Sequence, residues 1–336
     1  MTKHLLCAAV LAAGVGTAAV LAQSAVPPAD HNAKAKAAAG NDFSGLFART
    51  CGSLDRAPVA GRGAAGAGAQ ATLARDNWHA EPLKVFDNLY FVGQTEYSAW
   101  AVTTSDGIIL VDTIFDYSVE DEVVGGLRTL GLDPSKIKYA IVSHGHGDHS
   151  GGARYLQDHF GTRVLLSAED WDLLDRSTGT RPRRDMVATD GQKLTLGDTT
   201  LTMYLTPGHT AGTISTLIPV KDHGAPHLVA EWGGTAFNWL TNRRAYITPE
   251  KDDAFWFRTY MTSARRFRDI ADKAGADALI SNHTDFDGSK TKLPAVRARK
   301  AGDPNPYVIG KDGVRRYMTV AYECALAGLG RATSVK

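Results

Sequence analysis

The sequence predicts an α/β protein with two β-rich halves and with helices on the outside. Strand-like apolar runs begin each half, helical patterns are interleaved with them, and this order occurs twice along the chain, as in layered α/β architectures. The composition is that of an ordinary globular protein. Of the 336 residues, 43% are hydrophobic and 22% are charged, which is enough apolar mass for one large core or two medium ones.

The charge balance excludes one class of partner. Lysine and arginine total 37 and aspartate and glutamate total 36, so the formal net charge is +1. A chain without a basic field has little with which to attract nucleic acid. We therefore do not expect nucleic acid as a partner; a small-molecule substrate is expected only from the family resemblance described below.

The first 22 residues have the features of an export signal. Lys3 lies in a short polar start, residues 5–22 are almost wholly apolar or small, and cleavage is possible after Ala22 or Ala25. A retained membrane anchor is the alternative, which the many alanines and glycines disfavour. No later segment is apolar for long enough to cross a membrane. The sequence thus predicts a signal peptide over residues 1–22, a periplasmic or secreted protein, and no stable membrane association.

Residues 23–75 are rich in Ala, Gly and Pro and contain few side chains that could anchor a core. This composition predicts an extended leader, with a short docked helix possible over residues 43–54. Removal of the signal would leave Cys51 and Cys324. In an exported chain these two cysteines could form one disulfide or remain two free thiols.

The first β-rich half begins near Trp78. A β run over residues 85–93 is interrupted by Asp87-Asn88, a turn signal, and a hairpin follows around Ser105-Asp106-Gly107. The hairpin strands are expected over residues 98–104 and 108–112. The pattern then predicts a helix over 119–130, a strand over 137–142, a helix over 153–160, a strand over 163–167 and a short helix over 168–174.

The second half repeats the order of strands before helices. Two strands over residues 193–205 are joined by a Gly197-Asp198 turn. Further strands are predicted over residues 213–220 and 227–230, a long helix over 253–274, a last strand over 278–281 and a closing helix over 314–329.

The strongest chemical signal follows the strand over residues 137–142. Three histidines and one aspartate lie within six positions: His144, His146, Asp148 and His149. Two histidines separated by one residue can converge on one ion where the backbone turns, and the intervening glycines permit such a turn. Imidazole and carboxylate together suit zinc or a similar divalent cation. A surface loop that gathers histidines by chance is the alternative, and this density of histidines disfavours it.

Two isolated histidines could complete a metal site. His209 follows the strand over residues 202–205 and His283 follows the last strand. Since the cluster also follows a strand, all of these side chains could meet at one sheet edge. A serine nucleophile is the other hydrolytic option. Ser-x-x-Lys occurs at Ser135 and at Ser289, but without a Ser-Asp-Asn or Lys-Thr-Gly partner, so we interpret both as solvated loops.

From about Trp78 to its end, the chain resembles the metallo-β-lactamase superfamily. The landmarks occur in order: a strand that ends in Asp112, the His-x-His-x-Asp-His cluster, Gly208-His209-Thr210, and His283 after the last strand. Within the superfamily, the chain is most similar to the third subclass of class B β-lactamases. The long helix before His283, the helix that contains Cys324 and the exported N-terminus match that subclass.

The resemblance implies an αββα sandwich over residues 76–336 with two zinc ions. His144, His146 and His209 would hold the first zinc, and Asp148, His149 and His283 would hold the second. A metal-bound hydroxide would be the nucleophile, because metal binding lowers the pKa of water from 15.7 to about 7. Asp148 would also orient that hydroxide as the catalytic residue. The expected reaction is the opening of β-lactam rings.

One stretch departs from the family pattern. After residues 228–230 the subclass has a serine, whereas glyoxalases and many lactonases have a metal-bridging aspartate. This chain has Glu231-Trp232-Gly233-Gly234-Thr235. The serines that help hold a β-lactam carboxylate are therefore missing. Thr235 or Asn238 could substitute for them and Trp232 could line the pocket, while the glyoxalase and lactonase interpretations are weakened unless Glu231 bridges the metals.

Three alternatives to a β-lactamase remain open. A hydrolase on the same scaffold could cleave a lactone, an ester or a phosphodiester. A mononuclear iron dioxygenase of the persulfide type shares the histidine pattern and would hold one iron and no zinc. A protein that binds a metal or a partner without catalysis is the third, and the intact ligand set disfavours it.

Overall fold

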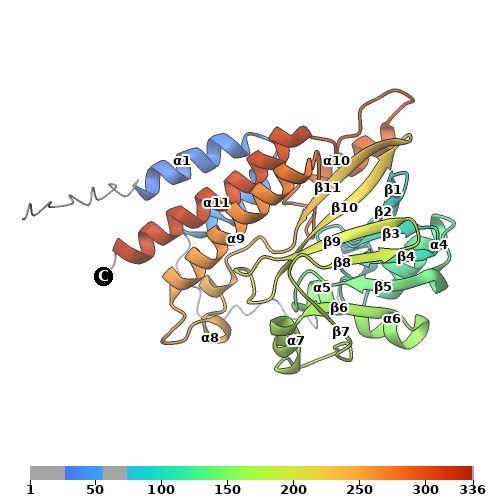
Figure 1. Ribbon diagram of the computed structural model, residues 1–336, viewed down its shortest axis with the longest axis horizontal. Helices are drawn as coiled ribbons and strands as arrows, with labels where there is room; N and C mark the ends of the chain where they lie inside the picture. Colours follow the sequence, from blue (N-terminus) through green and yellow to red (C-terminus); the bar gives the residue numbers. More distant parts are fainter. Residues whose placement is uncertain (1–26, 56–73, 335–336) are drawn as a thin grey trace, which may run out of the picture.

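In the computed structural model, residues 27–55 and 74–334 are described. The predicted signal peptide over residues 1–22 lies outside them. In the described part of the chain, two β-sheets face each other, and helices cover the outer face of each sheet (Figure 1). The layers therefore alternate as helix, sheet, sheet and helix. This arrangement confirms the αββα sandwich.

The first sheet comes from the first β-rich half of the chain. It is antiparallel from its first to its fourth strand and parallel from there on. In the described residues its strand order follows the chain: β1 (Leu83–Phe86), β2 (Leu89–Phe91), β3 (Trp100–Thr104), β4 (Gly107–Val111), β5 (Ile137–Ile141), β6 (Arg163–Ser167) and β7 (Met186–Ala188). Strand β7 was not predicted from the sequence.

The second sheet has the order β12-β11-β10-β9-β8. Its strands are antiparallel except for the parallel pair β11 and β12. Their bounds are β8 (Lys193–Leu196), β9 (Thr199–Leu205), β10 (Ile214–Asp222), β11 (Ala225–Trp232) and β12 (Ala278–Ser281). Each strand predicted from the alternation of the sequence is present, although β11 begins earlier than residue 227.

Helices cover the sandwich on both sides. The first sheet is covered by η3, a π-helix (Glu120–Val124), and by α4 (Gly125–Thr129), α6 (Ala153–Phe160) and α7 (Ala168–Asp175), with the short α5 (Gly147–Ser150) at its edge. The later helices are α8 (Arg243–Tyr246), α9 (Asp253–Ala274), α10 (Ser289–Ala298) and α11 (Gly310–Ser334). Of these, α9 and α11 are long and lie against the second sheet.

Three buried apolar clusters fill the spaces between these layers. One lies between the two sheets and contains Trp100, Ile141 and Ile218. A second joins the first sheet to its helices, and the third joins the second sheet to α9 and α11. Side chains of successive strand residues point to opposite faces, which is why β9 contributes Met203 to the cluster between the sheets and Tyr204 to the helical side.

The prediction of an extended leader is wrong for residues 28–54. Helix α1 (Pro28–Ala39) lies alongside α11, and α2 (Ser44–Arg49) follows it (Figure 1). Ala35 and Ala39 are fully buried against the third cluster. The alanine-rich composition, which indicated a lack of anchors, instead permits close approach of two helix backbones. The docked helix expected over residues 43–54 is confirmed in part by α2.

Cys51 and Cys324 form a disulfide in the structure, which joins the end of this N-terminal segment to the middle of α11. Of the two alternatives left open by the sequence, the structure has the paired one. In residues 27–55 and 74–334, no helix combines the length and the apolar character that crossing a membrane requires.

Candidate metal centre

The six histidine and aspartate residues predicted as ligands meet at one edge of the sandwich. His144 and His146 follow β5, and Asp148 and His149 lie in α5 directly after them. His209 follows β9 and His283 follows β12. The ends of strands from both sheets therefore contribute to a single cluster. Among the described residues, two sets of ligand atoms lie close enough to hold an ion and share His144, one with His146 and His209 and one with Asp148 and His149.

The first group consists of His144, His146 and His209. The Nε2 atom of His209 lies 3.1 Å from Nε2 of His144 and 3.2 Å from Nδ1 of His146. The opposite nitrogen of each ring is already engaged: Nδ1 of His144 donates to a carbonyl 2.8 Å away and Nδ1 of His209 to a carbonyl 2.6 Å away, while Nε2 of His146 is 2.8 Å from a tyrosine hydroxyl. As a result, the lone pairs on Nε2 of His144, Nδ1 of His146 and Nε2 of His209 point toward one position.

The donor set fits zinc. A tetrahedral zinc with Zn–N bonds of about 2.0–2.1 Å places its ligand nitrogens about 3.3 Å apart, close to the separations of 3.1 and 3.2 Å between the ring nitrogens. Burial lowers the pKa of His144 and His209 well below the usual value and that of His146 to about 4. All three imidazoles are therefore neutral at pH 7, as metal ligands must be.

The second group adds Asp148, His149 and His283. Nε2 of His149 lies 3.2 Å from both Nε2 of His283 and the Asp148 carboxylate, and His283 is 3.4 Å from that carboxylate. The side chains of Asp148 and His283 are 21% and 23% exposed. Because His149 is fully buried, solvent reaches this group along Asp148 and His283.

The charges of the second group are strongly coupled. Burial opposes ionisation of Asp148, but His149 and His283 hold the pKa of its carboxyl well below the usual value. Burial also opposes protonation of His149, yet the carboxylates of Asp148 and Asp112 raise its pKa to about 10. Without a metal ion His149 thus carries a proton, and binding of a cation there releases it.

Asp112 orients His149. Its carboxylate accepts from Nδ1 of His149 at 2.8 Å and from the backbone amide and hydroxyl of Ser143 at 2.7 and 2.9 Å. A carboxylate behind a ligating histidine fixes the tautomer and the direction of the ring. Asp112 has a positive φ of 62°, a conformation that a non-glycine residue adopts at some cost, and these three bonds hold it there.

Asp170 in α7 joins the two ligand-bearing loops, and no sequence signal pointed to it. Its buried carboxylate accepts from the backbone amide of Gly145 at 2.9 Å, from the Thr210 hydroxyl at 2.7 Å and from the amide of Gly212 at 3.0 Å. Gly145 lies between His144 and His146, and Thr210 follows His209. All three histidines of the first group are thus positioned relative to one carboxylate.

The segment after β11 contributes two further contacts to the first group. Tyr246 of α8 supplies the hydroxyl next to Nε2 of His146. The side-chain amide of Asn238, at the start of η5 (Asn238–Leu240), donates toward Nδ1 of His146 at 3.3 Å and Nε2 of His209 at 3.2 Å. Of the three substrate contacts predicted from the sequence, Asn238 is therefore at the metal centre.

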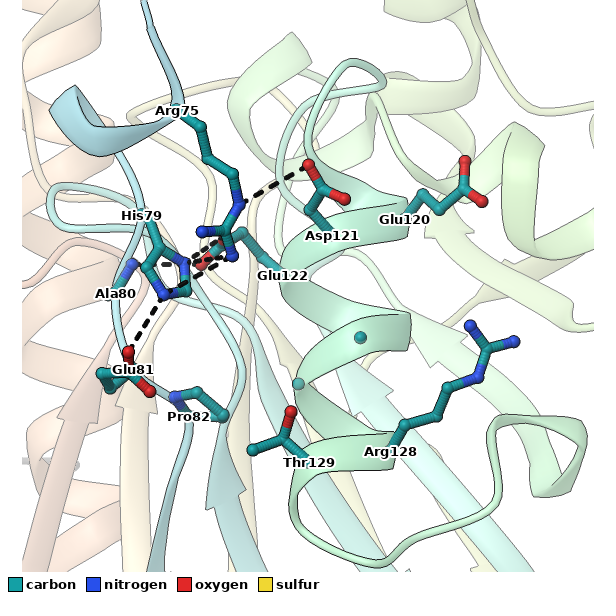
Figure 2. A pocket seen from close by; sticks show the side chains of 12 residues that line it. Arg75, His79, Ala80, Glu81, Pro82, Glu120, Asp121, Glu122, Arg128 and Thr129 are labelled. Carbon is teal, nitrogen blue, oxygen red and sulfur yellow. Dashed lines mark hydrogen bonds and ion pairs between the residues drawn. The ribbon is translucent and has the colours of Figure 1, made fainter.

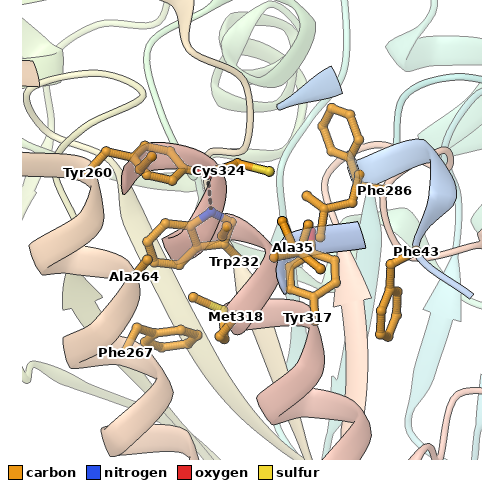
Figure 3. Close-up of a cluster of buried hydrophobic side chains, with 14 of the residues drawn as sticks. Ala35, Phe43, Trp232, Tyr260, Ala264, Phe267, Phe286, Tyr317, Met318 and Cys324 are labelled. Carbon is orange, nitrogen blue, oxygen red and sulfur yellow. Dashed lines mark hydrogen bonds between the residues drawn. The ribbon is translucent and has the colours of Figure 1, made fainter. Parts of the chain in front are cut away.

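The other two predicted substrate contacts are wrong. Trp232 is 1% exposed and belongs, with Ala230, to the cluster beneath α9 and α11, where its indole donates to Tyr260 at 3.2 Å (Figure 3). Strand alternation directs it away from the metal centre. Thr235 is equally buried, and its carbonyl accepts from the Tyr260 hydroxyl at 2.7 Å.

Glu231 faces away from this helical cluster and lies outside both ligand groups found among the described residues. It is fully buried, and burial raises the pKa of its carboxyl well above the usual value. The interpretation of Ser289 as a solvated loop residue is also wrong, because Ser289 is buried with its hydroxyl 2.8 Å from that of Tyr307.

A separate polar cavity of about 540 Å³ lies beside η3 (Figure 2). The buried carboxylate of Glu122 accepts from Nδ1 of His79 at 2.7 Å and from the amide of Ala80 at 3.1 Å. Arg75 lies 3.5 Å from Glu122 and 3.7 Å from Asp121. These charges pair with one another and attach the start of the first sheet to η3, so they are structural.

Comparison with known proteins agrees with this geometry. A family model described as the metallo-β-lactamase superfamily matches residues 92–223. Among curated proteins, the chain is 34% identical over 119 residues to a hydroxyacylglutathione hydrolase of Acidiphilium cryptum, a match that spans 35% of this chain and 43% of that protein. It is 28% identical to the N-acyl homoserine lactonase AttM of Azorhizobium caulinodans, over 52% of this chain and 69% of that protein.

Solved structures are similar over a longer part of the chain. BJP-1, a subclass B3 metallo-β-lactamase of Bradyrhizobium japonicum, superposes with a TM-score of 0.63 and 25% identity, covering 76% of this chain and 96% of that one. The FEZ-1 metallo-β-lactamase of Legionella gormanii gives a TM-score of 0.58 at 22% identity, covering 71% and 91%. The latter likeness concerns the fold alone.

Proposed function

The chain has a metallo-β-lactamase superfamily fold, and on that basis we propose that it is a zinc-dependent hydrolase that opens β-lactam rings. The observation that carries the proposal is the convergence of three imidazole lone pairs, from His144, His146 and His209, beside a second group of ligand atoms. Hydrolysis by a dinuclear zinc site requires two such adjoining groups.

His144, His146 and His209 would hold one zinc ion, and Asp148, His149 and His283 would hold the other. When bound, the ions would supply Lewis acidity and would lower the pKa of a coordinated water towards about 7. Asp148, the partly exposed carboxylate of the cluster, is the residue that can orient the attacking water. No side chain of the protein needs to become covalently attached to the substrate.

Asn238 is the residue that can bind the substrate carbonyl. Its amide lies 3.2–3.3 Å from ring nitrogens of His146 and His209, so an acyl group that reaches the first ligand group also meets a hydrogen-bond donor. A donor aimed at an oxygen on which negative charge develops stabilises the transition state of acyl transfer.

Two observations favour a cyclic amide substrate. The likeness to the structure of BJP-1 covers 96% of that β-lactamase with a TM-score of 0.63. Glu231, at the point where the resemblance places a bridging carboxylate in glyoxalases and many lactonases, lies outside the ligand groups of the described residues.

The second candidate is a lactone or ester hydrolase on the same scaffold. It rests on the match to the lactonase AttM, which spans 69% of that protein. The two candidates share the metal centre and differ only in the substrate that fits beside Asn238.

We also propose that the chain is exported to the periplasm or secreted. The disulfide between Cys51 and Cys324 supports this, because disulfides persist in oxidising compartments. N-terminal sequencing of the protein isolated from a periplasmic fraction tests the proposal. A mature N-terminus after Ala22 or Ala25 is expected, and an uncleaved Met1 in the cytoplasmic fraction would refute it.

A substrate panel separates the two candidates. We would assay the zinc-loaded protein with nitrocefin, a carbapenem, an acyl homoserine lactone and a simple ester, and compare Asn238→Ala with Asn242→Ala, an exposed asparagine a few residues on. The proposal predicts preferential turnover of the β-lactams and a loss of kcat/KM of about 10²–10³-fold in Asn238→Ala. Preference for the lactone would replace the lead candidate with the second.

A further inference from the structure

The loop that carries His283 is held between two segments of the chain. On one side it contacts the connection between β2 and β3: the amide of Ser98 donates to the Asn282 carbonyl at 2.9 Å, and the Thr284 hydroxyl donates to the Thr95 carbonyl at 2.6 Å. The amide of Thr284 donates to the Glu96 carbonyl at 3.2 Å. These bonds connect His283 to the core sheet.

On its other side, the loop contacts the N-terminal segment. A Cβ atom placed on Gly45 of α2 would lie 2.1 Å from the carbonyl oxygen of Asp285. Arg49, at the end of α2, lies 3.7 Å from the Asp285 carboxylate. The backbone of α2 therefore rests directly on the backbone of the loop two residues after His283, and only glycine permits this approach.

Residues 42–51, which we term the α2 clamp, are themselves firmly anchored. Arg316 of α11 donates to the Ala38 carbonyl at 3.0 Å and to the Asp42 carboxylate at 2.8 Å, and the disulfide joins Cys51 to Cys324. Figure 3 shows the apolar side of this anchorage, where Phe43, Phe286, Tyr317 and Cys324 share one buried cluster.

An aromatic contact completes the connection from the clamp to the metal centre. The ring of Phe286 lies 4.7 Å from the ring of His283, and Phe43 lies 5.3 Å from Tyr317 in the same cluster. The first ligand group has its own supports, the Gly233 and Ala236 carbonyls and Asp170. Asn282, next to His283, also donates to the Gly233 carbonyl at 2.8 Å. A displacement of the clamp would therefore move His283 directly and the first group only through this bond.

We propose that the α2 clamp is a positioning element for His283, and that it affects the affinity of the second metal subsite much more than that of the first. The inference rests on the proposed two-zinc function, since it concerns the subsite formed by Asp148, His149 and His283. Residues behind a metal ligand typically change metal affinity by about 10–100-fold when they are altered, and the clamp acts on His283 from such a place.

Gly45→Ala tests the proposal, with Gly52→Ala as its matched control. A Cβ on Gly45 meets the Asp285 carbonyl, whereas a Cβ on Gly52, a few residues on, has its nearest neighbour at 3.8 Å. We would titrate the metal-free variants with cobalt(II) and follow visible absorbance, which distinguishes a three-histidine site from one that contains a carboxylate. Circular dichroism would establish that each variant is folded.

The expected result is a rise of at least about tenfold in the dissociation constant of the second cobalt ion in Gly45→Ala, with a clearly smaller change for the first ion and no change in Gly52→Ala. Equal weakening of both sites, or an unchanged second site, would overturn the inference while leaving the proposed function intact. A wild-type protein that binds fewer than two ions would overturn the two-zinc function and the inference together.

A second pair of variants keeps the test decisive if Gly45→Ala does not fold. Arg49→Ala removes the ion pair to the loop, and Arg331→Ala removes an ion pair between α11 and Asp55, in the same N-terminal segment. The proposal expects a smaller, selective loss at the second subsite in Arg49→Ala only. Identical titrations of Arg49→Ala and Arg331→Ala would contradict it.

Discussion

The carboxylate of Asp170 lies 2.9 Å from the backbone amide of Gly145, the residue between His144 and His146. The same carboxylate receives the hydroxyl of Thr210, next to His209. One buried side chain of α7 thus determines where two separate loops place three histidines. A metal site built from distant parts of the chain needs such a common reference point, because each loop alone is free to move.

Replacement of Asp170 by alanine should weaken both the fold and the first metal subsite. The amides of Gly145 and Gly212 and the Thr210 hydroxyl would lose a buried acceptor, and each unsatisfied group costs about 1–3 kcal/mol. We expect the free energy of unfolding to fall by about 3 kcal/mol or more, measured by urea denaturation. Asp172→Ala, on the same helix but in an exposed ion pair, should change it by less than about 0.5 kcal/mol. Equal effects of the two variants would contradict this role.

Asp170 should also make stability depend on pH. Burial raises the pKa of its carboxyl to about 6, despite three hydrogen bonds that lower it, whereas an aspartate in the unfolded chain has a pKa of about 3.9. The folded state thus binds this proton more tightly than the unfolded chain does. The contribution of Asp170 to the free energy of unfolding is therefore complete below a pH of about 4, and it is lost as the pH rises through about 6.

The comparison of wild type with Asp170→Asn isolates that proton. With metal removed by chelation, urea denaturation at several pH values should show the stability of the wild type relative to the variant falling between pH of about 4 and 6. A difference that stays constant over this range would show that Asp170 ionises alike in the folded and unfolded chains.

Tyr246→Phe should reduce zinc affinity through His146. The Tyr246 hydroxyl lies 2.8 Å from Nε2 of His146 and so helps to fix the tautomer that leaves Nδ1 free for a cation. Loss of such a partner typically weakens metal binding about 10–100-fold, which competition with a zinc chelator would measure. Tyr322→Phe, on α11, should bind zinc like the wild type. Wild-type affinity in Tyr246→Phe would exclude the positioning role.

Removal of the disulfide should destabilise the fold. The two cysteines are separated by 273 positions, and a cross-link over so long a loop restricts the unfolded chain by about 3–5 kcal/mol. The double variant Cys51→Ser with Cys324→Ser should therefore lose stability of this size in urea denaturation, without a reductant. A loss below about 1 kcal/mol would show that packing of α1 against α11 suffices by itself.

Much of the fold could be predicted because its signals are local. The helix predicted over residues 253–274 is α9 with the same bounds, since Asp252 caps its first turn and Gly275, in a left-handed conformation, ends it. The six candidate ligand residues stand out in the sequence because they follow apolar strands, and the family resemblance groups them into two sets. In a layered fold the ends of the strands collect at one edge of the sheets. Residues that directly follow different strands in the sequence can therefore be expected to lie close together.

What could not be predicted depends on partners far along the chain. Helix α1 is stable because α11, nearly 300 residues later, lies beside it, and its alanine-rich sequence carries no sign of that partner. Trp232 suggested a pocket residue because it follows Glu231 near the expected site, yet strand alternation turns it into the core. In the sequence, nothing distinguishes Asp170 from other polar residues near the start of a helix. Its role follows from its hydrogen bonds to Gly145 and Thr210, which are distant in the sequence.

Zinc-dependent hydrolysis is best tested by measuring bound metal and turnover on the same sample. We expect about two zinc ions per chain, turnover of nitrocefin that stops on chelation and returns with zinc, and no turnover in a folded His146→Ala variant. Turnover that survives complete removal of metal, or that persists in His146→Ala, would contradict this expectation.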